Sequence, residues 1–354
     1  MTTAPASRFL PFAAAGILAL TGCSAAPAPA TPPISCARGA VSGQGSSAQT
    51  NAVNAWIKAY QIACPDASVE YTSSGSGAGV RAFLAGDGDF AGTDTPLSTA
   101  DQQRADARCG TGRAVHLPLV TGPIALAYNV AGIDGLRLTP RTIARIFSGQ
   151  VTVWNDPAIA ADNEGTALPA TRIRIVHRSD GSGTTANFLA FLTGTDSGWA
   201  HGDGSTWPLP GGLGQRGSHR VVAAIGRTDG AIGYVEASYA RVTDLPAVAV
   251  GTAGGDFVTP TDDAAGLTVA AAQVSGTGGD LRLRIDPATT TGRGYPIVSV
   301  TYQVVCRGSV PEAARSFLAY AASDRGQEAA QRAGFAPLPA ALRSQVAQAI
   351  AGLR

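Results

Sequence analysis

The sequence has little charge and almost no lysine. Charged residues make up 14% of the 354 positions, and Lys58 is the only lysine among the 26 lysine and arginine residues. Without further lysines the chain has no GxxxxGK[ST] motif, which excludes a P-loop nucleotide site. The formal net charge is +1 and no basic cluster occurs, so we do not expect nucleic acid as a partner.

Signatures of catalytic and metal centres are also lacking. The four histidines form no HExxH motif, no two cysteines have zinc-ligand spacing, and no paired-carboxylate pattern occurs. The serines in glycine-rich turns each lack at least one glycine of the G-x-S-x-G motif of serine hydrolases: Ser46, Ser47, Ser76 and Ser182. The sequence therefore predicts no catalytic residues, no metal and no cofactor, and the chain is not expected to be an enzyme.

The N-terminus has the form of an export signal. Arg8 precedes an apolar run from Phe9 to Leu20, which is too short to span a bilayer but suits a signal peptide. The run ends in LTGC, which resembles the lipobox of bacterial lipoproteins. This resemblance implies that residues 1–22 are removed and that Cys23 carries palmitate and a second lipid chain. Residues 23–35 are rich in proline and alanine and would form an extended tether.

Three segments share one plan, in which a β-rich run leads through a serine and glycine turn into a helix. They are RGAVSGQGSSAQTNAVNAWIKAY, ASVEYTSSGSGAGVRAFLAG and RIRIVHRSDGSGTTANFLAFL. In the first, Val53, Trp56, Ile57 and Tyr60 fall on one helical face. GQGSSA, followed by Glu70, also fits a dinucleotide fingerprint, but nicotinamide cofactors are not expected in an exported protein.

Such helix starts are suited to bind an anion. The first turn of a helix has unpaired N–H groups and partial positive charge, glycine permits close approach, and serine adds hydroxyl donors. Arg178 adds a fixed cation, and we expect Asp180 to pair with it, because a bare buried arginine is costly. Ordinary N-caps are the alternative for the serines, and a solvated turn is the alternative for Asp94.

The combined motifs resemble a known family. SGQGSSAQTNA, TSSGSGAGVRAFLAGDGDFAGTDTPLS, TPRTIARIFSGQVTVWNDP, IVHRSDGSGTTANF and GAIGYVEASYA are similar, in collinear order, to the PstS phosphate-binding proteins of ABC phosphate importers. The similarity runs from about Arg38 to the C-terminus and is nearest to the actinobacterial lipoproteins. It implies that the protein captures inorganic phosphate outside the cell and delivers it to a membrane permease. An exported phosphatase and a surface sensor or antigen are the alternatives.

The resemblance also implies which residues hold phosphate. The family often has a threonine where Ser47 stands and an aromatic residue where Ala48 stands. Ser47 keeps the hydroxyl group, whereas Ala48 lacks the aromatic side chain. Asp94 is expected to accept the proton that phosphate carries and sulfate lacks. The expected phosphate-binding residues are Ser46, Ser47, Ala48, Ser76, Asp94, Arg178, Asp180, Ser182, Gly183 and Thr184.

The fold implied by the resemblance is α/β, a type II periplasmic-binding-protein fold. Two α/β lobes joined by two hinge strands would close over the anion, as a monomer anchored at the outer face of the cell membrane. Lobe 1 would contain 36–122 and 297–354, and lobe 2 would contain 123–296. The β-rich runs AVHLPLVTGPIALAYN and YPIVSVTYQVV are the expected hinges, and LTPRTIARIFSGQ would open the second lobe with Thr139 as N-cap.

Four cysteines remain once Cys23 is set aside, an even number as disulfides in an exported protein require. Cys64 and Cys109 each precede an expected strand of the first lobe, Cys36 precedes its first strand, and Cys306 ends the second hinge run. We therefore expect the pairs Cys64–Cys109 and Cys36–Cys306, although sequence alone permits three connectivities. Four free buried thiols are the alternative.

Overall fold

The computed structural model describes Met1, Thr2 and residues 34–354. The predicted lipidation site Cys23 lies outside the described residues, as do most of the predicted signal peptide and the tether up to residue 33. Residues 34–354 form one compact unit. Within the described part of the chain, no helix is both long and apolar enough to cross a bilayer.

An eight-stranded sheet organises residues 34–354. Its strand order is β2-β1-β3-β13-β4-β8-β6-β7. The bounds of these strands are β1 Gly39–Gly45, β2 Ala67–Thr72, β3 Phe90–Thr93, β4 Ala114–Asn129, β6 Arg174–Arg178, β7 Leu213–Gln215, β8 Ala231–Glu236 and β13 Val298–Cys306. Strands 1, 2 and 3 are parallel, so their carboxyl ends lie along one edge of the sheet.

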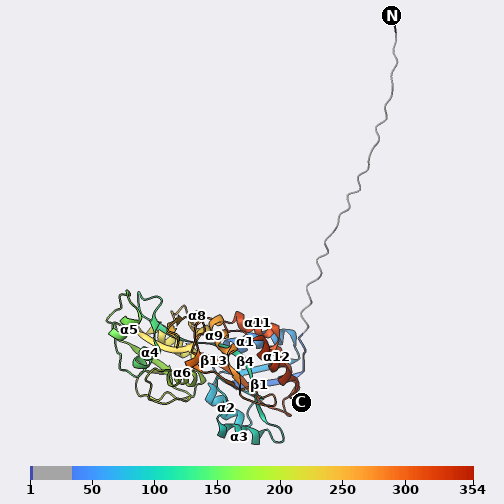
Figure 1. Ribbon diagram of the computed structural model, residues 1–354. Coiled ribbons are helices and arrows are strands. Elements are labelled where there is room, and N and C mark those ends of the chain that lie inside the picture. Colours follow the sequence, from blue (N-terminus) through green and yellow to red (C-terminus); the bar gives the residue numbers. More distant parts are fainter. Residues whose placement is uncertain (3–33) are drawn as a thin grey trace. The chain divides into compact units, whose positions relative to one another are not determined.

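The long strands β4 and β13 are central neighbours in this sheet (Figure 1). β4 pairs with β13 through its first part and with β8 through its second, so it runs through both halves of the sheet. All residues of β13 are buried, and in β4 only Asn129 is not. Such continuous burial matches the long apolar runs that predicted these two strands.

Twelve helices accompany the strands in the described residues. In Figure 1, α1, α11 and α12 lie on one side of β4 and β13, and α4, α5 and α6 lie on the other. The bounds are α1 Thr50–Ala63, α2 Ser76–Ala85, α3 Thr99–Arg108, α4 Pro140–Phe147, α5 Pro157–Asp162, α6 Gly183–Gly194, α7 Ser218–Arg227, α8 Ala237–Val242, α9 Asp262–Ala270, α10 Glu312–Ala322, α11 Asp324–Arg332 and α12 Ala340–Ala351. Shorter elements are β5 Arg137–Leu138, β9 Ala249–Gly251, β10 Phe257–Val258, β11 Gln273–Val274, β12 Leu283–Arg284 and a 3-10 turn at Pro287–Thr289.

The three predicted strand–turn–helix units are confirmed as β1–α1, β2–α2 and β6–α6. In α1 the predicted apolar face is buried at Val53, Trp56 and Tyr60. α4 begins as predicted, because the Thr139 hydroxyl accepts a hydrogen bond from the backbone N–H of Thr142 at 3.2 Å.

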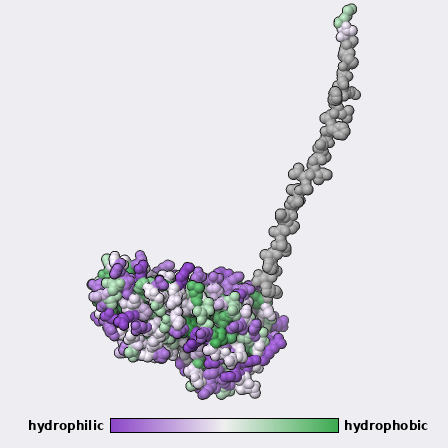
Figure 2. Space-filling model, in the orientation of Figure 1, coloured by the Kyte–Doolittle hydropathy of each residue, from purple (hydrophilic) through white to green (hydrophobic). Residues whose placement is uncertain are grey.

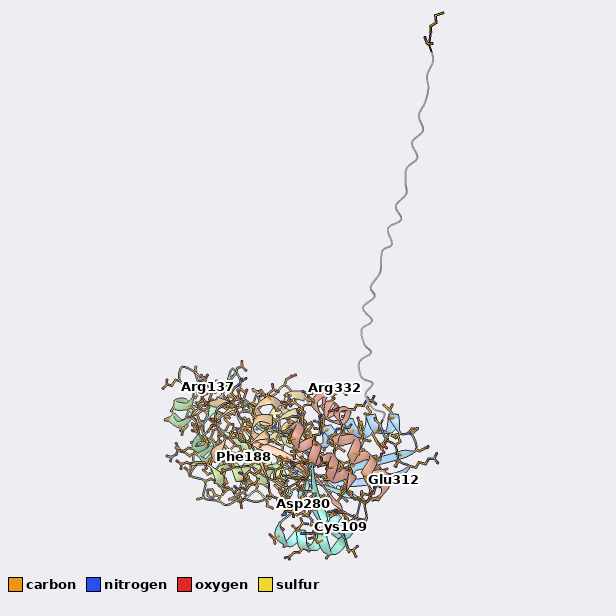
Figure 3. The ribbon with its side chains drawn as sticks, turned by 45° about the vertical axis from the view of Figure 1, so that its right-hand side comes forward. Cys109, Arg137, Phe188, Asp280, Glu312 and Arg332 are labelled. Carbon is orange, nitrogen blue, oxygen red and sulfur yellow. A yellow bond between two sulfur atoms is a disulfide. The ribbon has the colours of Figure 1, made fainter. Side chains whose placement is uncertain are left out.

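An aromatic cluster connects α6 with the loop 202–212, which precedes β7. Phe188 on α6 is labelled in Figure 3. Its ring centroid lies 4.7 Å from those of Phe147 and Tyr234. Trp207, from the loop, stacks on His177 with centroids 5.1 Å apart and an interplanar angle of 20°. The loop is therefore held against the end of β6. Figure 2 shows that hydrophilic residues cover most of the visible face, with hydrophobic residues in smaller patches.

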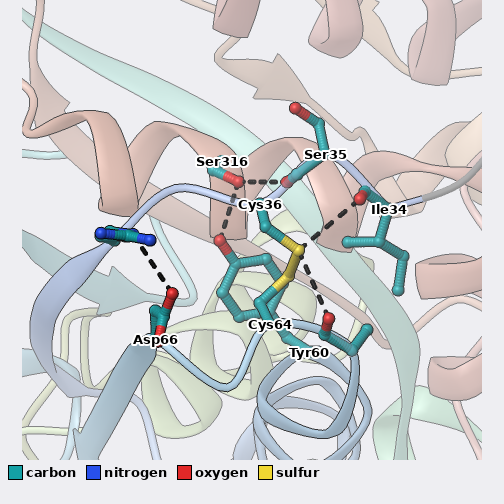
Figure 4. Close-up of a disulfide and its surroundings, with 9 residues drawn as sticks. Ile34, Ser35, Cys36, Tyr60, Cys64, Asp66 and Ser316 are labelled. Atoms are coloured by element: carbon teal, nitrogen blue, oxygen red, sulfur yellow. Dashed lines mark hydrogen bonds and ion pairs between the residues drawn. A yellow bond between two sulfur atoms is a disulfide. The ribbon is translucent and has the colours of Figure 1, made fainter.

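The disulfides correct the predicted pairing. Cys36 is joined to Cys64 and Cys109 to Cys306, whereas Cys64–Cys109 and Cys36–Cys306 were expected. Figure 4 shows Cys36 and Cys64 together at the end of α1, where the Cys36 sulfur lies 3.5 Å from the carbonyl oxygen of Ala63. The prediction of two disulfides is therefore confirmed, and their connectivity was wrong.

The reason lies in which strands are neighbours. β1 and β2 are parallel, with Gly39 opposite Ala67, so Cys36 and Cys64 each stand three residues before paired positions. β13 is antiparallel to β4, and its last residue Cys306 lies opposite Ala114, close to Cys109 at the end of α3. The expectation placed each cysteine at a strand end but paired strands that are not adjacent.

We predict that replacing Cys109 and Cys306 together by serine destabilises the protein more than replacing Cys36 and Cys64. Cys109–Cys306 closes a loop of 197 residues and Cys36–Cys64 closes one of 28 residues. The longer loop restricts the unfolded chain more, so its disulfide should add about 2 kcal/mol more to the free energy of unfolding. Guanidinium denaturation of both double variants measures this difference. Peptide mapping without reduction that recovers Cys64 joined to Cys109 would contradict the connectivity.

Glu236, the last residue of β8, is a buried carboxyl group with incomplete hydrogen bonding. Its Oε2 accepts a bond from the backbone N–H of Ser238 at 3.0 Å and another from the Ser238 hydroxyl. Its Oε1 has no partner among the described residues. Burial raises the pKa of Glu236 to about 8, against the smaller opposing effects of these bonds and of Arg241. The folded protein therefore favours the neutral acid.

We predict that the stability cost of Glu236 grows with pH. Between its unfolded pKa and about 8 the folded state holds one more proton, so the free energy of unfolding falls by about 1.4 kcal/mol per pH unit. Glu236→Gln, which has the same shape and no charge, should remove this slope. Urea denaturation from pH 5 to pH 8 compares the two, with the exposed Glu70→Gln as control. Parallel curves for wild type and Glu236→Gln would contradict the assignment.

Candidate anion-binding site

The predicted site residues come from strand ends and helix starts. Ser46, Ser47 and Ala48 connect β1 to α1, Ser76 begins α2, and Asp94 directly follows β3. Arg178 ends β6, and Ser182 is the N-cap of α6. The residues that follow β1, β2 and β3 share one edge of the sheet because these strands are parallel. Contacts of α6 with Asp94 bring Arg178 and Ser182 close to that edge.

Two glycines allow the helix starts to meet. A Cβ atom at Gly183 would come 2.5 Å from the Cβ of Asp94, so a side chain cannot be accommodated there. At Gly75 a Cβ atom would lie 2.4 Å from Oδ2 of Asp180, and the φ angle of +92° also favours glycine. The starts of α2 and α6 therefore lie directly beside Asp94 and Asp180.

Hydrogen bonds join the two groups. The backbone N–H of Gly77 donates to the carbonyl of Gly181 at 3.0 Å, and Asn187 Nδ2 donates to the carbonyl of Asp94 at 2.7 Å. The Ser47 hydroxyl accepts from the N–H of Ser218 at 3.1 Å, at the start of α7. All ten predicted residues are thus brought into one region.

Asp94 is the buried carboxylate of this region. Its Oδ1 accepts hydrogen bonds from the hydroxyls of Ser46 at 2.5 Å and Thr301 at 2.7 Å. Its Oδ2 accepts from Ser76 at 3.2 Å. Burial raises the pKa of Asp94, while these bonds and the charge of Arg178 act in the opposite direction. The side chain is therefore costly to ionise and is surrounded by groups that favour the ionised form.

Arg178 is held in place by Asp180. Nε and Nη2 of the guanidinium donate to the two carboxylate oxygens of Asp180 at 2.7 and 2.6 Å, and Gly217 N–H donates to the same carboxylate at 3.2 Å. Burial alone would raise the pKa of Asp180, but the bonds and charge of Arg178 outweigh it and lower the pKa. Among the described residues nothing accepts from Nη1 of Arg178, so this fixed cation keeps a donor for a ligand.

The start of α6 has donors without acceptors. The Ser182 hydroxyl caps the helix by accepting from Thr185 N–H at 3.2 Å. The N–H groups of Gly183 and Thr184 have no acceptor among the described residues. Thr184 is 1% exposed, and its hydroxyl oxygen has no hydrogen-bond partner in the described chain. Buried donors are normally paired, so these groups point to a bound acceptor such as an oxyanion.

The hydroxyls of the predicted serines have different partners. Those of Ser46 and Ser76 bond to Asp94, that of Ser47 bonds to Ser218, and that of Ser182 caps α6. Ala48 contributes its backbone N–H, which donates to the Ser46 hydroxyl at 3.1 Å. Several predicted ligand donors therefore organise the site from within.

Other residues were missed by the sequence analysis. Thr301 reaches Asp94 from β13, Asn187 reaches it from α6, and Tyr239 donates to the Ser47 carbonyl at 2.8 Å. Two signals were present in the sequence. Gly217 and Ser218 form a fourth glycine–serine helix start, and the buried strand β13 has polar residues at alternate positions, Ser299, Thr301 and Gln303.

Other features lie away from this region. No three His, Cys, Asp or Glu side chains of the described chain lie together as metal ligands would. A cavity of about 450 Å³ near the start of β4 and the end of β13 contains none of the ten predicted residues. Its lining includes Arg113, Asp280, Arg282, Arg307 and Arg354.

Comparison with known proteins agrees with this geometry. A family model described as "PBP superfamily domain" matches residues 30–325. The chain is 40% identical to the phosphate-binding protein PstS 2 of Mycobacterium tuberculosis over 95% of each chain. It is also 40% identical to PstS 3 of that organism, over 86% of this chain and 84% of that protein.

Solved structures with little sequence identity share the fold. The phosphate-bound, high-affinity periplasmic phosphate-binding protein PfluDING has a TM-score of 0.72 at 23% identity, with 87% of this chain and 93% of that one covered. A phosphate-binding protein of Stenotrophomonas maltophilia has a TM-score of 0.67 at 21% identity, over 88% and 93%. The predicted α/β periplasmic-binding-protein fold is confirmed, and the chain belongs to the PstS family of phosphate-binding proteins, within the PBP superfamily.

Proposed function

We propose that this protein is an extracytoplasmic, lipid-anchored receptor that captures inorganic phosphate and delivers it to an ABC-type importer in the membrane. The observation that carries the proposal is the buried carboxylate of Asp94 inside a region otherwise rich in donors. The names of its relatives, phosphate-binding proteins of the PstS type, support the same ligand.

The donors would supply the attraction for the anion. Arg178 offers a positive charge held by Asp180, and the start of α6 offers the unpaired groups of Gly183 and Thr184. These groups would hold phosphate and sulfate alike, because both are tetrahedral oxyanions. Discrimination must therefore come from another group of the site.

Asp94 would supply the rejection of sulfate. A carboxylate can only accept a hydrogen bond, and beside an anion it repels unless a proton lies between them. Phosphate near neutral pH brings such a proton, and sulfate does not. A sulfate ion would require Asp94 to take a proton from solvent or to remain charged and unpaired. The cost of such an unmatched buried group is the basis of strong selectivity.

The ligand would lie between two lobes. Lobe 1 would contain 36–122 and 297–354, and lobe 2 would contain 123–296, with β4 and β13 as hinges. Pairing of β4 with β13 on one side and with β8 on the other supports this division. The burial of Asp94 and Arg178 supports lobes that are closed over the site. The protein would act as a monomer.

The protein would perform no chemistry on its ligand. The curated relatives are binding proteins, and the site described above offers donors and one acceptor rather than an activated nucleophile. A chromogenic phosphate ester tests the enzymatic alternative. Turnover that Asp94→Ala abolishes would favour a phosphatase.

We predict phosphate binding at micromolar concentration or tighter, with sulfate weaker by about 10³-fold or more. Asp94→Asn, which can donate to either anion, should bring sulfate to within about 10-fold of phosphate, whereas Arg178→Ala should weaken both anions by about 10²-fold or more. Calorimetry on residues 34–354 measures these constants, with the exposed Asp134→Asn as control. Equal affinity of the wild type for the two anions would remove the role assigned to Asp94.

We predict that Cys23→Ala releases the full-length protein from membranes. A single acyl chain gives marginal binding, so stable anchoring requires the two lipid chains expected at a lipobox cysteine. Fractionation of cells into membrane and soluble parts, with Cys23→Ala beside wild type, makes the test. Membrane retention of the alanine variant would contradict lipid anchoring at Cys23 while leaving phosphate binding untouched.

A further inference from the structure

A polar stripe runs along the crossing strand β13. Ser299, Thr301 and Gln303 alternate with apolar residues, and each is at most 3% exposed. Tyr302 pairs with Thr93 of β3, which places Thr301 beside the following residue, Asp94. The register of β13 against β4 shifts between Thr301 and Tyr302, an irregularity of the kind that redirects side chains near functional sites.

The acceptor positions of Asp94 are unequally used. A carboxylate offers about four lone-pair positions, two on each oxygen. On Oδ1 both are taken, by the hydroxyls of Ser46 and Thr301. On Oδ2 the Ser76 hydroxyl takes one, which leaves a single open position on this oxygen among the described contacts.

The open position faces the start of α6. A Cβ atom at Gly183 would lie 2.7 Å from Oδ2 of Asp94 and 2.8 Å from the Ser76 hydroxyl oxygen. Oδ2 is therefore directed toward the helix start where Thr184 has its unpaired hydroxyl and N–H groups. An anion bound to those donors would meet Oδ2 and not Oδ1.

We propose that Thr301 is a positioning residue for the discrimination between oxyanions, because its hydroxyl occupies Oδ1 of Asp94 and leaves one acceptor position, on Oδ2, for a proton of the bound anion. This inference rests on the proposed phosphate-binding function. Thr301 does not touch the anion itself. It acts from a crossing strand, so the selectivity of the site depends on the position of that strand.

The same hydroxyl favours the ionised carboxylate. The hydroxyls of Thr301 and Ser46 donate to the Asp94 carboxylate, and the positive charge of Arg178 also favours its ionised form. The other titratable groups that interact electrostatically with Asp94 are Tyr71 and Tyr239. Loss of the Thr301 hydroxyl would let Asp94 keep a proton at higher pH and turn toward the anion as a donor. Sulfate would then meet a donor instead of a bare carboxylate.

Thr301→Val tests the proposal, because it removes the hydroxyl and keeps the shape. The readout is the ratio of the sulfate and phosphate dissociation constants at pH 8, measured by calorimetric displacement. The loss of a hydrogen bond to a charged group changes an equilibrium constant by about 10–100-fold. The ratio of the sulfate and phosphate dissociation constants should therefore fall by about that factor. Thr301→Ser should restore the wild-type ratio. Thr301→Ala removes the same hydroxyl without added bulk and carries the same expectation if the valine variant does not fold.

Thr121→Val is the matched control. Thr121 is a buried threonine of the neighbouring crossing strand β4, and its hydroxyl donates to the carbonyl of Ala336 at 3.0 Å, away from Asp94. Its loss should lower stability and leave the ratio unchanged. A folded Thr301→Val or Thr301→Ala protein with the wild-type ratio would overturn the proposal. Failure of the wild type to bind phosphate would instead overturn the proposed function.

Discussion

The burial of Asp94 is the constraint on which the site depends. A carboxylate removed from water must be given hydrogen-bond donors or a proton, and here three hydroxyls come from three separate parts of the chain. Ser46 follows β1, Ser76 begins α2, and Thr301 lies on β13. These contacts require β1, β3 and β13 to be adjacent, so the strand order of the sheet and the chemistry of the site are linked.

The arrangement separates attraction from discrimination. In the proposed mechanism, Arg178 and the start of α6 would supply charge and donors that any oxyanion could use, while Asp94 would offer one open acceptor position that only a protonated anion could fill. Asp180 fixes Nε and Nη2 of Arg178 and leaves Nη1 without an acceptor among the described residues, so the proposed attraction would have a defined direction. Selectivity would then arise from the cost of an unmatched buried group rather than from additional contacts.

Local patterns in the sequence predicted the elements, and long-range pairing determined what was missed. The glycine and serine turns before α1, α2 and α6 identified three helix starts, because such turns depend on neighbouring residues alone. The disulfide connectivity depended on β1 lying beside β2 and β13 beside β4, which no local pattern reports. Thr301 was missed for the same reason, since its contact with Asp94 follows from the register of β13 with β3.

The central claim is that one proton lies between Asp94 and the bound anion. The phosphate dianion brings this proton, and sulfate must obtain it from solvent, so sulfate binding takes up one proton more than binding of the phosphate dianion. The most direct test is the ratio of the two dissociation constants between pH 8 and pH 9, with sulfate measured by displacement. We expect the selectivity for phosphate dianion over sulfate to rise about 10-fold across this unit of pH. A ratio that does not change with pH would contradict the account.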